Sequence, residues 1–384
     1  MILLFAMNFN KKPEKKIIYL ITEDSFFESH FLERAIAAYN EGFKIFLVTS
    51  ISGRHLNIPE DKITIIPIKF SRSGLNPFSD LLTLKEILLI YHKLKPDILH
   101  HVALKPIVYG SIAAFLAKID AKIVNAPVGM GFVFTSKSIK ALVLRPFVNL
   151  LLKMTLGLRG AVVIFENPDD LKFAVEKKMV SNGNAVLIKG AGVDVSKFVP
   201  RESGNSIPVV TMVARMLVDK GVVEFIEAAR IVNRDNSIAL FNLVGDVDHS
   251  NRGSLSTDYL KAHSGSNGLN WVGFRENIAD IYAGSDIACL PSYREGLPKS
   301  LIEAAACGLP IVTTDTIGCR EVVLHGVNGF LVPIKSAASL AEAILHLISD
   351  CDLRAKMGRE SRRRSVSEFS SQIVVARTLE IYRQ

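Results

Sequence analysis

Two glutamates, Glu295 and Glu303, stand eight positions apart at the start of the stretch EGLPKSLIEAAACGLP, residues 295–310. The Gly-Leu-Pro after the first glutamate predicts a loop that leads into a short helix over 298–308, and the β-branched run 311–314 predicts a strand after it. Such a loop presents free backbone N–H groups where the positive end of the helix dipole favours an anion. The carboxylates cannot bind that anion, but they can accept hydrogen bonds from hydroxyl groups on either side of it. A nucleotide sugar, with ribose, diphosphate and hexose in a row, has this layout.

This motif resembles the signature of retaining GT-B glycosyltransferases of family 4, in which seven residues separate two glutamates and Gly-Leu-Pro follows the first. The resemblance implies that Glu295 is a catalytic residue that holds hydroxyl groups of the donor sugar and that Glu303 binds the ribose. It also implies that Gly296, Leu297 and Pro298 face the sugar and the phosphate. The alternative is an ordinary amphipathic helix with both glutamates in solvent, and the helix stop followed by a strand argues against it.

Two cations, Arg215 and Lys220, stand five positions apart where a predicted strand turns into a helix. There they can grip a diphosphate, Arg215 through a forked pair of hydrogen bonds and Lys220 as a point charge. They resemble the Arg–Lys pair with which the family stabilises the leaving diphosphate, so both residues are predicted to be catalytic. Fixed cations and helix amides would meet the developing charge without a metal. Two unrelated surface cations are the alternative interpretation.

The strand predicted next in this half ends in Gly245, Asp246 and Asp248. An Asp-x-Asp sequence can hold manganese in transferases of another fold, but no further carboxylate or histidine cluster completes an octahedral site, so no metal is predicted. By resemblance, Gly245 and Asp246 form the glycine turn beside the nucleotide. Phe274 follows another predicted strand and stands where the family's backbone reads the base, although a purely structural turn explains that segment nearly as well.

The composition suggests the partners of the chain. Its 384 residues are too many for one ordinary core and indicate two domains or one large domain. The chain is 49% hydrophobic with a mean hydropathy of +0.27, and it is basic, with a formal charge of +8 and a pI of about 9.2. An anionic membrane surface or a phosphorylated lipid fits both properties. Nucleic acid fits less well, because RNA-binding aromatic signatures, helix-turn-helix patterns and zinc-finger spacing are missing.

The four cysteines contain no Cys-x-x-Cys pair, so neither a zinc site nor a disulfide framework is predicted, and a reducing cytosol is expected. Residues 1–7 are apolar, but the lysines follow this run instead of preceding it, which is wrong for a secretory signal. No stretch of 18 apolar residues without charges predicts a membrane-spanning helix. We therefore expect a cytoplasmic protein that is peripheral on the inner face of the membrane.

Strands alternate with helices along the chain, which predicts parallel sheets with helices on both faces. In the first half the predicted strands are 17–21, 44–49, 63–68, 96–101, 121–125 and 160–165, and the predicted helices are 30–40, 81–94 and 109–118. After a polar linker at 200–208, the predicted strands are 209–214, 237–244, 269–273, 287–290 and 311–314.

The predicted fold class is therefore α/β, with two Rossmann-like doubly wound domains facing a cleft, the GT-B architecture. The N-terminal domain, residues 1–200, would bind the acceptor, and the C-terminal domain, residues 207–371, would bind the nucleotide sugar. The resemblance implies that the last helix, within 372–384, packs back on the first domain.

Histidines supply the candidate chemistry of the first domain. The acidic-aromatic segment 22–30 follows the first strand in place of the Gly-Gly loop of many GT-B enzymes, and its last residue, His30, either faces the cleft or caps and packs. His100 and His101 end a predicted strand, which resembles the family position where a histidine approaches the reacting sugar. His100 is assigned as catalytic, with His101 left as the other choice. Lys105 is placed on the acceptor side, where it could meet a phosphate.

A glycine loop with Gly129 and Gly131 follows the predicted strand 121–125. It is similar to the Gly-Leu-Gly-Tyr-Val-Phe pattern of polysaccharide-assembly members of the family and is expected to shape the acceptor pocket. Asn167, after the strand 160–165, also matches these members and is predicted to face the cleft.

The segment 137–159 is basic and apolar and contains no acidic residue. Its cations are Lys137, Lys140, Arg145, Lys153 and Arg159. Apolar positions cover more than one helix face, so a buried helix is one interpretation. We favour a helix that lies on anionic lipid beside a lipid-linked acceptor, because every charged position is cationic.

Together these features resemble a retaining glycosyltransferase of cell-surface polysaccharide synthesis. It would move a hexose or N-acetylhexosamine from a UDP-sugar to a polyprenyl-diphosphate-linked saccharide, without a cofactor. Retention and the choice of UDP are implied by the family. No enzymic nucleophile is evident, so a front-face displacement is expected, with geometry supplying much of the rate. One alternative is a UDP-sugar 2-epimerase of the same fold; another is a non-catalytic nucleotide-sugar-binding protein, which need not keep all of Arg215, Lys220, Glu295 and Glu303.

Overall fold

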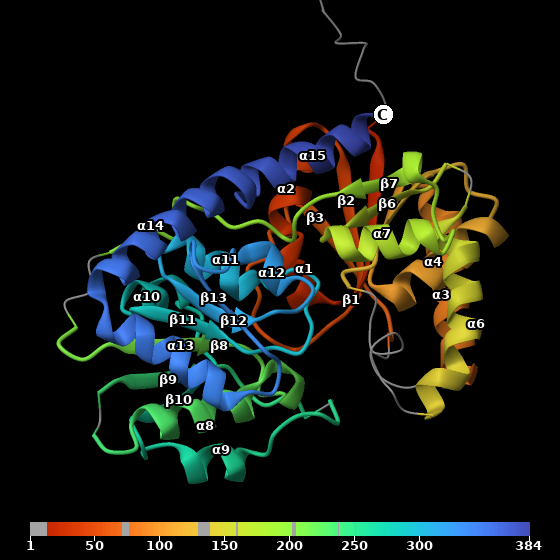
Figure 1. Cartoon of the computed structure of the whole chain (residues 1–384). Coiled ribbons are helices and arrows are strands. Elements are labelled where there is room, and N and C mark those ends of the chain that lie inside the picture. The colour runs from red at the N-terminus through yellow and green to blue at the C-terminus, as the bar shows by residue number, and fades with distance from the viewer. Residues whose placement is uncertain are drawn as a thin grey trace, which may run out of the picture. The chain divides into compact units, whose positions relative to one another are not determined.

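The computed structural model describes residues 14–70, 77–129, 139–158, 160–201, 205–236, 238–249 and 251–384. The chain forms two compact units, each built as a sheet covered by helices (Figure 1). The first unit contains Met1–Ile164, Ala174–Val186 and Thr378–Gln384, and the second contains Phe165–Phe173 and Leu187–Arg377. The predicted linker at 200–208 falls within the second unit.

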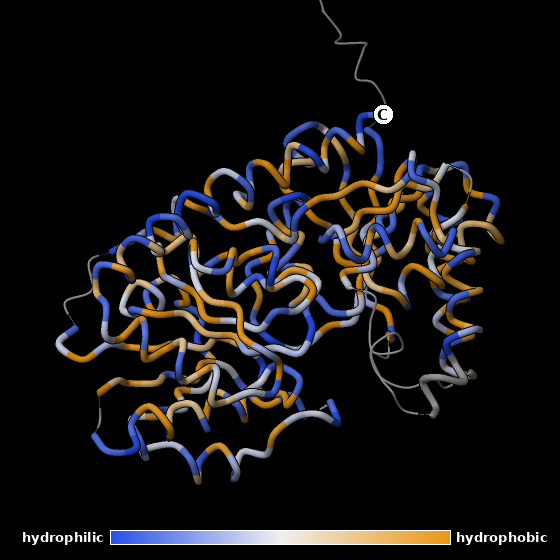
Figure 2. The backbone as a smooth tube through the Cα atoms, in the orientation of Figure 1, coloured by the Kyte–Doolittle hydropathy of each residue, from blue (hydrophilic) through white to orange (hydrophobic). Residues whose placement is uncertain are grey.

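The first unit has a seven-stranded sheet in the order β3-β2-β1-β4-β5-β6-β7, and its strands pair in parallel from β3 to β6. The strands are β1 (Lys16–Glu23), β2 (Lys44–Ser50), β3 (Ile63–Pro67), β4 (Ile98–Val102), β5 (Lys122–Ala126), β6 (Val162–Phe165) and β7 (Ala185–Leu187). Parallel strands are covered on both faces, so they are apolar along most of their length, as Figure 2 shows. Five consecutive residues of β1, from Ile17 to Ile21, are fully buried.

The helices of the first unit are α1 (Asp24–His30), α2 (Leu32–Asn40), α3 (Pro77–Leu94), α4 (Leu104–Leu116) and α6 (Ile139–Leu156). Helix α4 packs against both α3 and α6 (Figure 1). The chain passes from one unit to the other within β6, within β7, and within two helices, α7 (Pro168–Glu176) and α15 (Ser371–Arg383).

The second unit has a six-stranded parallel sheet in the order β10-β9-β8-β11-β12-β13. Its strands are β8 (Val209–Val213), β9 (Leu240–Val244), β10 (Leu269–Gly273), β11 (Ile287–Leu290), β12 (Ile311–Thr314) and β13 (Gly329–Val332). Its helices are α8 (Val222–Val232), α9 (Thr257–His263), α10 (Ile278–Ala283), α11 (Lys299–Ala306), α12 (Cys319–Val322), α13 (Ala337–Ser349) and α14 (Cys351–Glu368).

Two arginines of α14 donate hydrogen bonds to backbone carbonyls within the second unit. Arg362 donates to the carbonyls of Phe198 and Ala306, both at 2.7 Å, and Arg364 donates to the carbonyl of Val322 at 2.7 Å. Ala306 and Val322 end α11 and α12, so these guanidinium groups bind carbonyls that a helix end leaves free. Part of the basic charge of the chain is therefore used inside the second unit.

The predicted fold class is confirmed, since both sheets are parallel α/β sheets in which the strand order reverses next to the first strand of the unit. Several predicted bounds are shifted by a few residues, and some elements differ in kind or were missed. Most of the segment 22–30 was expected to be a loop and instead forms α1, and the short strands β7 and β13 were not predicted. Among the described residues, we find no helix with the length and hydropathy needed to span a membrane.

Candidate functional site

The carboxyl ends of neighbouring parallel strands meet at one edge of a sheet, and the predicted donor-binding residues follow four such ends in the second unit. Arg215 and Lys220 follow β8, Gly245 and Asp246 follow β9, Phe274 follows β10, and Glu295, Gly296, Leu297, Pro298 and Glu303 follow β11. The structure thus brings all of them to the same edge of the second sheet.

Lys220 and Glu295 contact each other directly. The lysine Nζ donates to both carboxylate oxygens, at 2.6 and 2.8 Å, and the two side chains are only 20% and 11% exposed. Lys220 is followed by Gly221, which has a φ of +77° between a 3-10 turn and α8. A Cβ at Gly221 would lie 2.1 Å from the carbonyl oxygen of Pro291, so only glycine fits here.

The loop from Glu295 to Pro298 leads directly into α11, which begins at Lys299, one residue after the predicted start. Pro298 occupies the N-cap position and provides no side-chain cap, so the first turn of the helix lacks that partner for its N–H groups. The side chain of Leu297 is buried, so it is the backbone of this residue that can face a ligand.

Glu303 lies on α11 with its carboxylate largely buried. Burial raises the pKa of Glu303, and Lys299, whose Nζ lies 3.7 Å from the carboxylate, acts in the opposite direction. A poorly hydrated carboxylate gains from a hydroxyl donor that replaces its missing water.

Arg215 forms an ion pair with Asp248, at 2.6 Å. The neighbouring Asp246 accepts a hydrogen bond from the backbone N–H of Val247 at 2.8 Å, so both carboxylates of the Asp-x-Asp sequence have protein partners. Gly245 has a φ of +138°, and a Cβ there would lie 1.8 Å from the carbonyl oxygen of Ala214. The glycine is therefore needed for the β8 and β9 loops to approach each other.

The indole of Trp271 donates to the carbonyl of Gly245 at 2.9 Å, and the N–H of Gly245 donates to the carbonyl of Gly273 at 2.9 Å. These bonds join the β9 and β10 loops. Phe274, directly after them, leaves half of its side chain exposed at this edge.

His100 and His101 lie inside β4 and are fully buried, whereas the sequence placed His100 at a catalytic strand end. His100 Nδ1 hydrogen-bonds the Tyr382 hydroxyl at 2.5 Å, and its ring stacks on Tyr19 with a centroid distance of 5.1 Å. Burial lowers the pKa of His100 well below its usual range. Within the described part of the first unit, this ring is a core residue with no open side.

His101 is a core residue in the same way. Its Nδ1 lies 2.9 Å from Asn125 Oδ1, which can only accept, so the neutral ring donates there and accepts from the Tyr91 hydroxyl at 3.0 Å through Nε2. Burial lowers the pKa of His101 to about 4.

Sequence reasoning missed Tyr382, because its contact with His100 joins residues 282 positions apart.

The other predicted acceptor-side residues of the first unit have local partners. His30 ends α1, stacks on Phe26 at 4.1 Å and hydrogen-bonds Ser29 Oγ at 2.7 Å. Lys105 Nζ lies 3.4 Å from Asp80 Oδ1. Gly129 has a φ of +89°, whereas Gly131 lies outside the described residues.

Asn167 differs most from its predicted place on the acceptor side. It is fully buried, belongs to the second unit, and donates through Nδ2 to the carbonyl of Gly296 at 2.8 Å. Asp170 and Arg294, which sequence reasoning also missed, form an ion pair at 2.6 Å beside it. The only signal in the sequence is Asn-Pro-Asp-Asp at 167–170, which is typical of a helix start.

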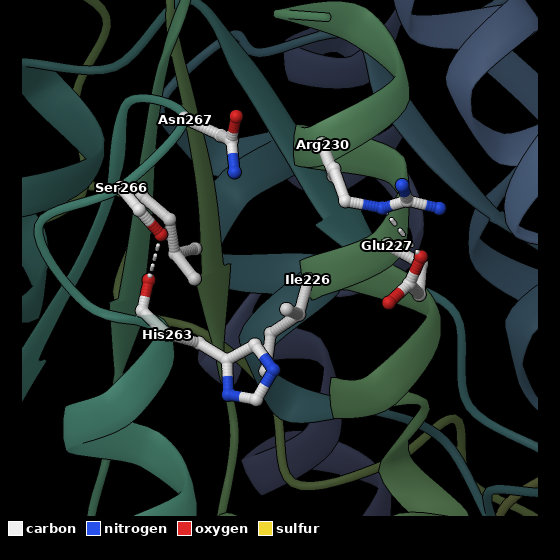
Figure 3. A pocket seen from close by; sticks show the side chains of 7 residues that line it. Ile226, Glu227, Arg230, His263, Ser266 and Asn267 are labelled. Atoms are coloured by element: carbon white, nitrogen blue, oxygen red, sulfur yellow. Dashed lines mark hydrogen bonds and ion pairs between the residues drawn. The ribbon is translucent and has the colours of Figure 1, made fainter.

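A pocket of about 80 Å³ opens elsewhere in the second unit, between α8 and the loop before β10 (Figure 3). There Arg230 pairs with Glu227 at 3.0 Å, and Ser266 Oγ donates to the carbonyl of His263 at 2.9 Å. This pocket lies at the start of β10, away from the strand ends that carry the candidate site. Its volume is also smaller than that of pockets that hold drug-sized ligands, which is several hundred Å³.

Two family models match the chain. The model for glycosyl transferases group 1 matches residues 197–364, and a glycosyl transferase 4-like model matches residues 16–158.

The chain is 30% identical over 347 residues to the N,N'-diacetylbacillosaminyl-diphospho-undecaprenol alpha-1,3-N-acetylgalactosaminyltransferase of Campylobacter jejuni, covering 85% of this chain and 89% of that protein. It is 26% identical over 344 residues to the UDP-Gal:alpha-D-GlcNAc-diphosphoundecaprenol alpha-1,3-galactosyltransferase of Escherichia coli, covering 86% of each. Among solved structures, the sucrose-phosphate synthase of Thermosynechococcus elongatus has the same fold, with a TM-score of 0.78, 19% identity, and coverage of 97% of this chain and 99% of that one.

Proposed function

The chain belongs to the group 1 family of glycosyltransferases, family 4, and we propose that it moves a hexose or N-acetylhexosamine from a UDP-sugar to a polyprenyl-diphosphate-linked saccharide. The Campylobacter and Escherichia relatives support this choice, since both are named for transfer to a saccharide on diphospho-undecaprenol and the second for UDP-Gal as donor. We assign retention of the anomeric configuration and a role in cell-surface polysaccharide synthesis on the same family likeness.

The observation that carries the proposal is the contact of Lys220 with Glu295 at the strand-end edge that also holds Arg215 and Glu303. A diphosphate is a stronger partner for Lys220 and Arg215 than the carboxylates that they bind in the free protein, because it carries more charge. When the lysine turns to the phosphate, Glu295 is released to accept hydrogen bonds from the hydroxyls of the sugar. Glu303 then takes the ribose.

The reaction proceeds by separation of charge at the anomeric carbon. As the bond to the diphosphate breaks, negative charge grows on the phosphate oxygens, where Arg215, Lys220 and the first turn of α11 stabilise it. A diphosphate oxygen takes the proton of the acceptor hydroxyl as that hydroxyl attacks the same face of the sugar. We leave His100 out of this scheme, since its buried ring is hydrogen-bonded to Tyr382 and stacked on Tyr19.

A lipid-linked acceptor requires the protein to work at a membrane surface, and α6 within the basic segment 137–159 supports such a contact. Phe147, Leu150 and Met154 recur at helical spacing on α6, and each leaves more than half of its side chain exposed, with Lys153 beside them. We propose that this face lies on anionic lipid at the inner face of the cell membrane.

The membrane contact can be tested with vesicles. Arg145→Glu together with Lys153→Glu should lower co-sedimentation with anionic vesicles severalfold and leave UDP binding intact. The matched control is Arg252→Glu with Lys261→Glu, which changes the net charge equally at exposed positions of the second unit. Equal loss of sedimentation in both variants would show only a net-charge effect and would contradict a contact through α6.

The transfer itself is tested by incubating the protein with radiolabelled UDP- and GDP-sugars and a polyprenyl-diphosphate-linked saccharide. Label that enters the organic phase from a UDP-sugar supports the proposal. A UDP-sugar 2-epimerase would instead give an epimer or free sugar without an acceptor, and a binding protein would bind UDP without turnover. Either of these results would replace the proposed function.

A further inference from the structure

The backbone on both sides of Glu295 is fixed by buried side chains that have no part in the proposed chemistry. After Glu295, the carbonyl of Gly296 accepts a hydrogen bond from Asn167 Nδ2 at 2.8 Å. Before it, the guanidinium of Arg294 donates to Asp170 Oδ1 at 2.6 Å. Asn167 is fully buried and Asp170 is 3% exposed, so both anchors are protected from competing water.

Asn167 and Asp170 also bind each other. Asn167 Oδ1 accepts from the backbone N–H of Asp170 at 2.8 Å, as the cap of an α-helix does, and its Nδ2 donates to Asp170 Oδ2 at 3.0 Å. Both Nδ2 hydrogens and the amide oxygen are therefore in use, which neither alanine nor aspartate at position 167 could reproduce. Asn167 and Asp170 at the start of α7 are thus bound to each other and together hold the loop around Glu295 in place.

Two glycines close the other side of this loop. A Cβ on Gly318 would lie 2.6 Å from the carbonyl oxygen of Gly296 and 2.7 Å from that of Glu295. A Cβ on Gly190 would lie 2.7 Å from Leu297 Cδ2. The backbone around Glu295 is therefore in close contact on two sides and has little room to move.

We propose that Asn167, Asp170 and Arg294 are positioning residues of sugar transfer, which hold the backbone of Glu295 so that its carboxylate meets the donor sugar. This inference rests on the proposed role of Glu295. A group misplaced by about 1 Å can cost about a hundredfold in rate, so the network should act on turnover. The side chains that would bind UDP, those of Arg215, Lys220 and Glu303, form no hydrogen bond with Asn167, Asp170 or Arg294, so the affinity for UDP should change less than turnover.

The experiment compares Asn167→Ala, Asp170→Asn and Arg294→Gln with the wild type. We expect kcat to fall about tenfold to a hundredfold in Asn167→Ala, while the Kd for UDP stays within about threefold. Arg294→Gln should lose more than Asp170→Asn, because it leaves a buried carboxylate without its cation. The double variant Asp170→Asn with Arg294→Gln should then be more active than Arg294→Gln alone. The control Asp280→Asn, which removes the exposed pair with Arg201 at 3.3 Å in the same unit, should behave as the wild type.

Hydrogen exchange of the amides at 293–297, measured without any ligand, separates this inference from the proposed function. Faster exchange there in Asn167→Ala and Asp170→Asn, with unchanged exchange in the β8–β10 strands, supports the network whatever sugar the enzyme uses. Unchanged exchange at 293–297 would overturn it, and so would kcat, UDP affinity and Tm falling together in every variant. If the wild type transfers no sugar, the proposed function fails, but the exchange result still decides whether the loop is anchored.

Discussion

Lys220 Nζ lies 2.6 Å from one carboxylate oxygen of Glu295 and 2.8 Å from the other, so a cation and an anion of the candidate site pair with each other when no donor is bound. A phosphate that binds this lysine competes with the carboxylate for its N–H groups. Under the proposed function, the same exchange prepares both groups: Lys220 meets the leaving diphosphate and Glu295 meets the sugar. Donor binding and the alignment of the sugar are then one event.

The variant Glu295→Gln separates these two roles. It removes the competing carboxylate from Lys220, so the affinity for UDP should be unchanged or higher by about threefold. It also weakens the acceptor for the sugar hydroxyls, so kcat should fall by about a hundredfold. Calorimetric titration with UDP and single-turnover transfer measure the two effects, with Glu227→Gln on α8 as a control that removes a surface carboxylate. A parallel loss of UDP affinity and of turnover would contradict this division of roles.

The pair of Arg215 with Asp248 predicts a gain of affinity on mutation. In Asp248→Asn the guanidinium no longer has an anionic partner at 2.6 Å and is free to meet a phosphate. We expect UDP to bind about twofold to fivefold more tightly, with the difference shrinking as salt is raised, because Arg215 is 43% exposed and partly screened. UDP titrations at low and high ionic strength check this. Weaker binding in Asp248→Asn would instead indicate that Asp248 orients Arg215 for the ligand.

The sheets could be predicted from the sequence because parallel strands buried on both faces are continuous apolar runs. The bounds of β10, β11 and β12 match the prediction residue for residue. Helix α1 could not be predicted, because it has no side-chain N-cap and its seven residues show no long apolar period. The three-residue strand β7 is only half buried and gives no alternating pattern.

The family could be predicted from the motif of Glu295 and Glu303, because this motif is defined by the spacing of residues close together in the sequence. The matching family models confirm the prediction. Residues whose partners are remote in sequence were harder to place. His100 binds Tyr382, and Asn167 binds Gly296 over 129 positions; no local pattern tells such a core polar residue from a ligand-binding one. The roles assigned to individual donor-binding residues stay predictions.

Glu303 gives a prediction of pH-dependent stability. Burial raises the pKa of its carboxyl, so the folded protein holds this proton at a pH where the unfolded chain has lost it. Stability from this group is therefore present in acid and is lost as pH rises through the raised pKa. Glu303→Gln carries no charge, so its Tm should exceed that of the wild type at pH 7.5, and the difference should vanish near pH 4.

Calorimetric melts across that pH range test the point, and Glu342→Gln on α13, at a more exposed position, is the matched control. The gain in stability should accompany weaker UDP binding, since the ribose loses its carboxylate partner. A Tm difference that grows toward acid would reverse the sign and contradict the raised pKa.

The Tyr382 hydroxyl lies between His100 Nδ1, at 2.5 Å, and the Tyr19 hydroxyl, at 2.8 Å, and all three residues are buried in the first unit. Tyr382→Phe keeps the shape of the ring and removes both bonds. Leaving buried polar groups without a partner should lower the free energy of unfolding by about 1–3 kcal/mol. If His100 is a core residue, kcat of the folded variant, measured well below its Tm, should equal that of the wild type. The control Tyr39→Phe, at an exposed tyrosine of α2, should change neither quantity. A loss of kcat without a loss of stability in Tyr382→Phe would indicate that His100 takes part in the reaction.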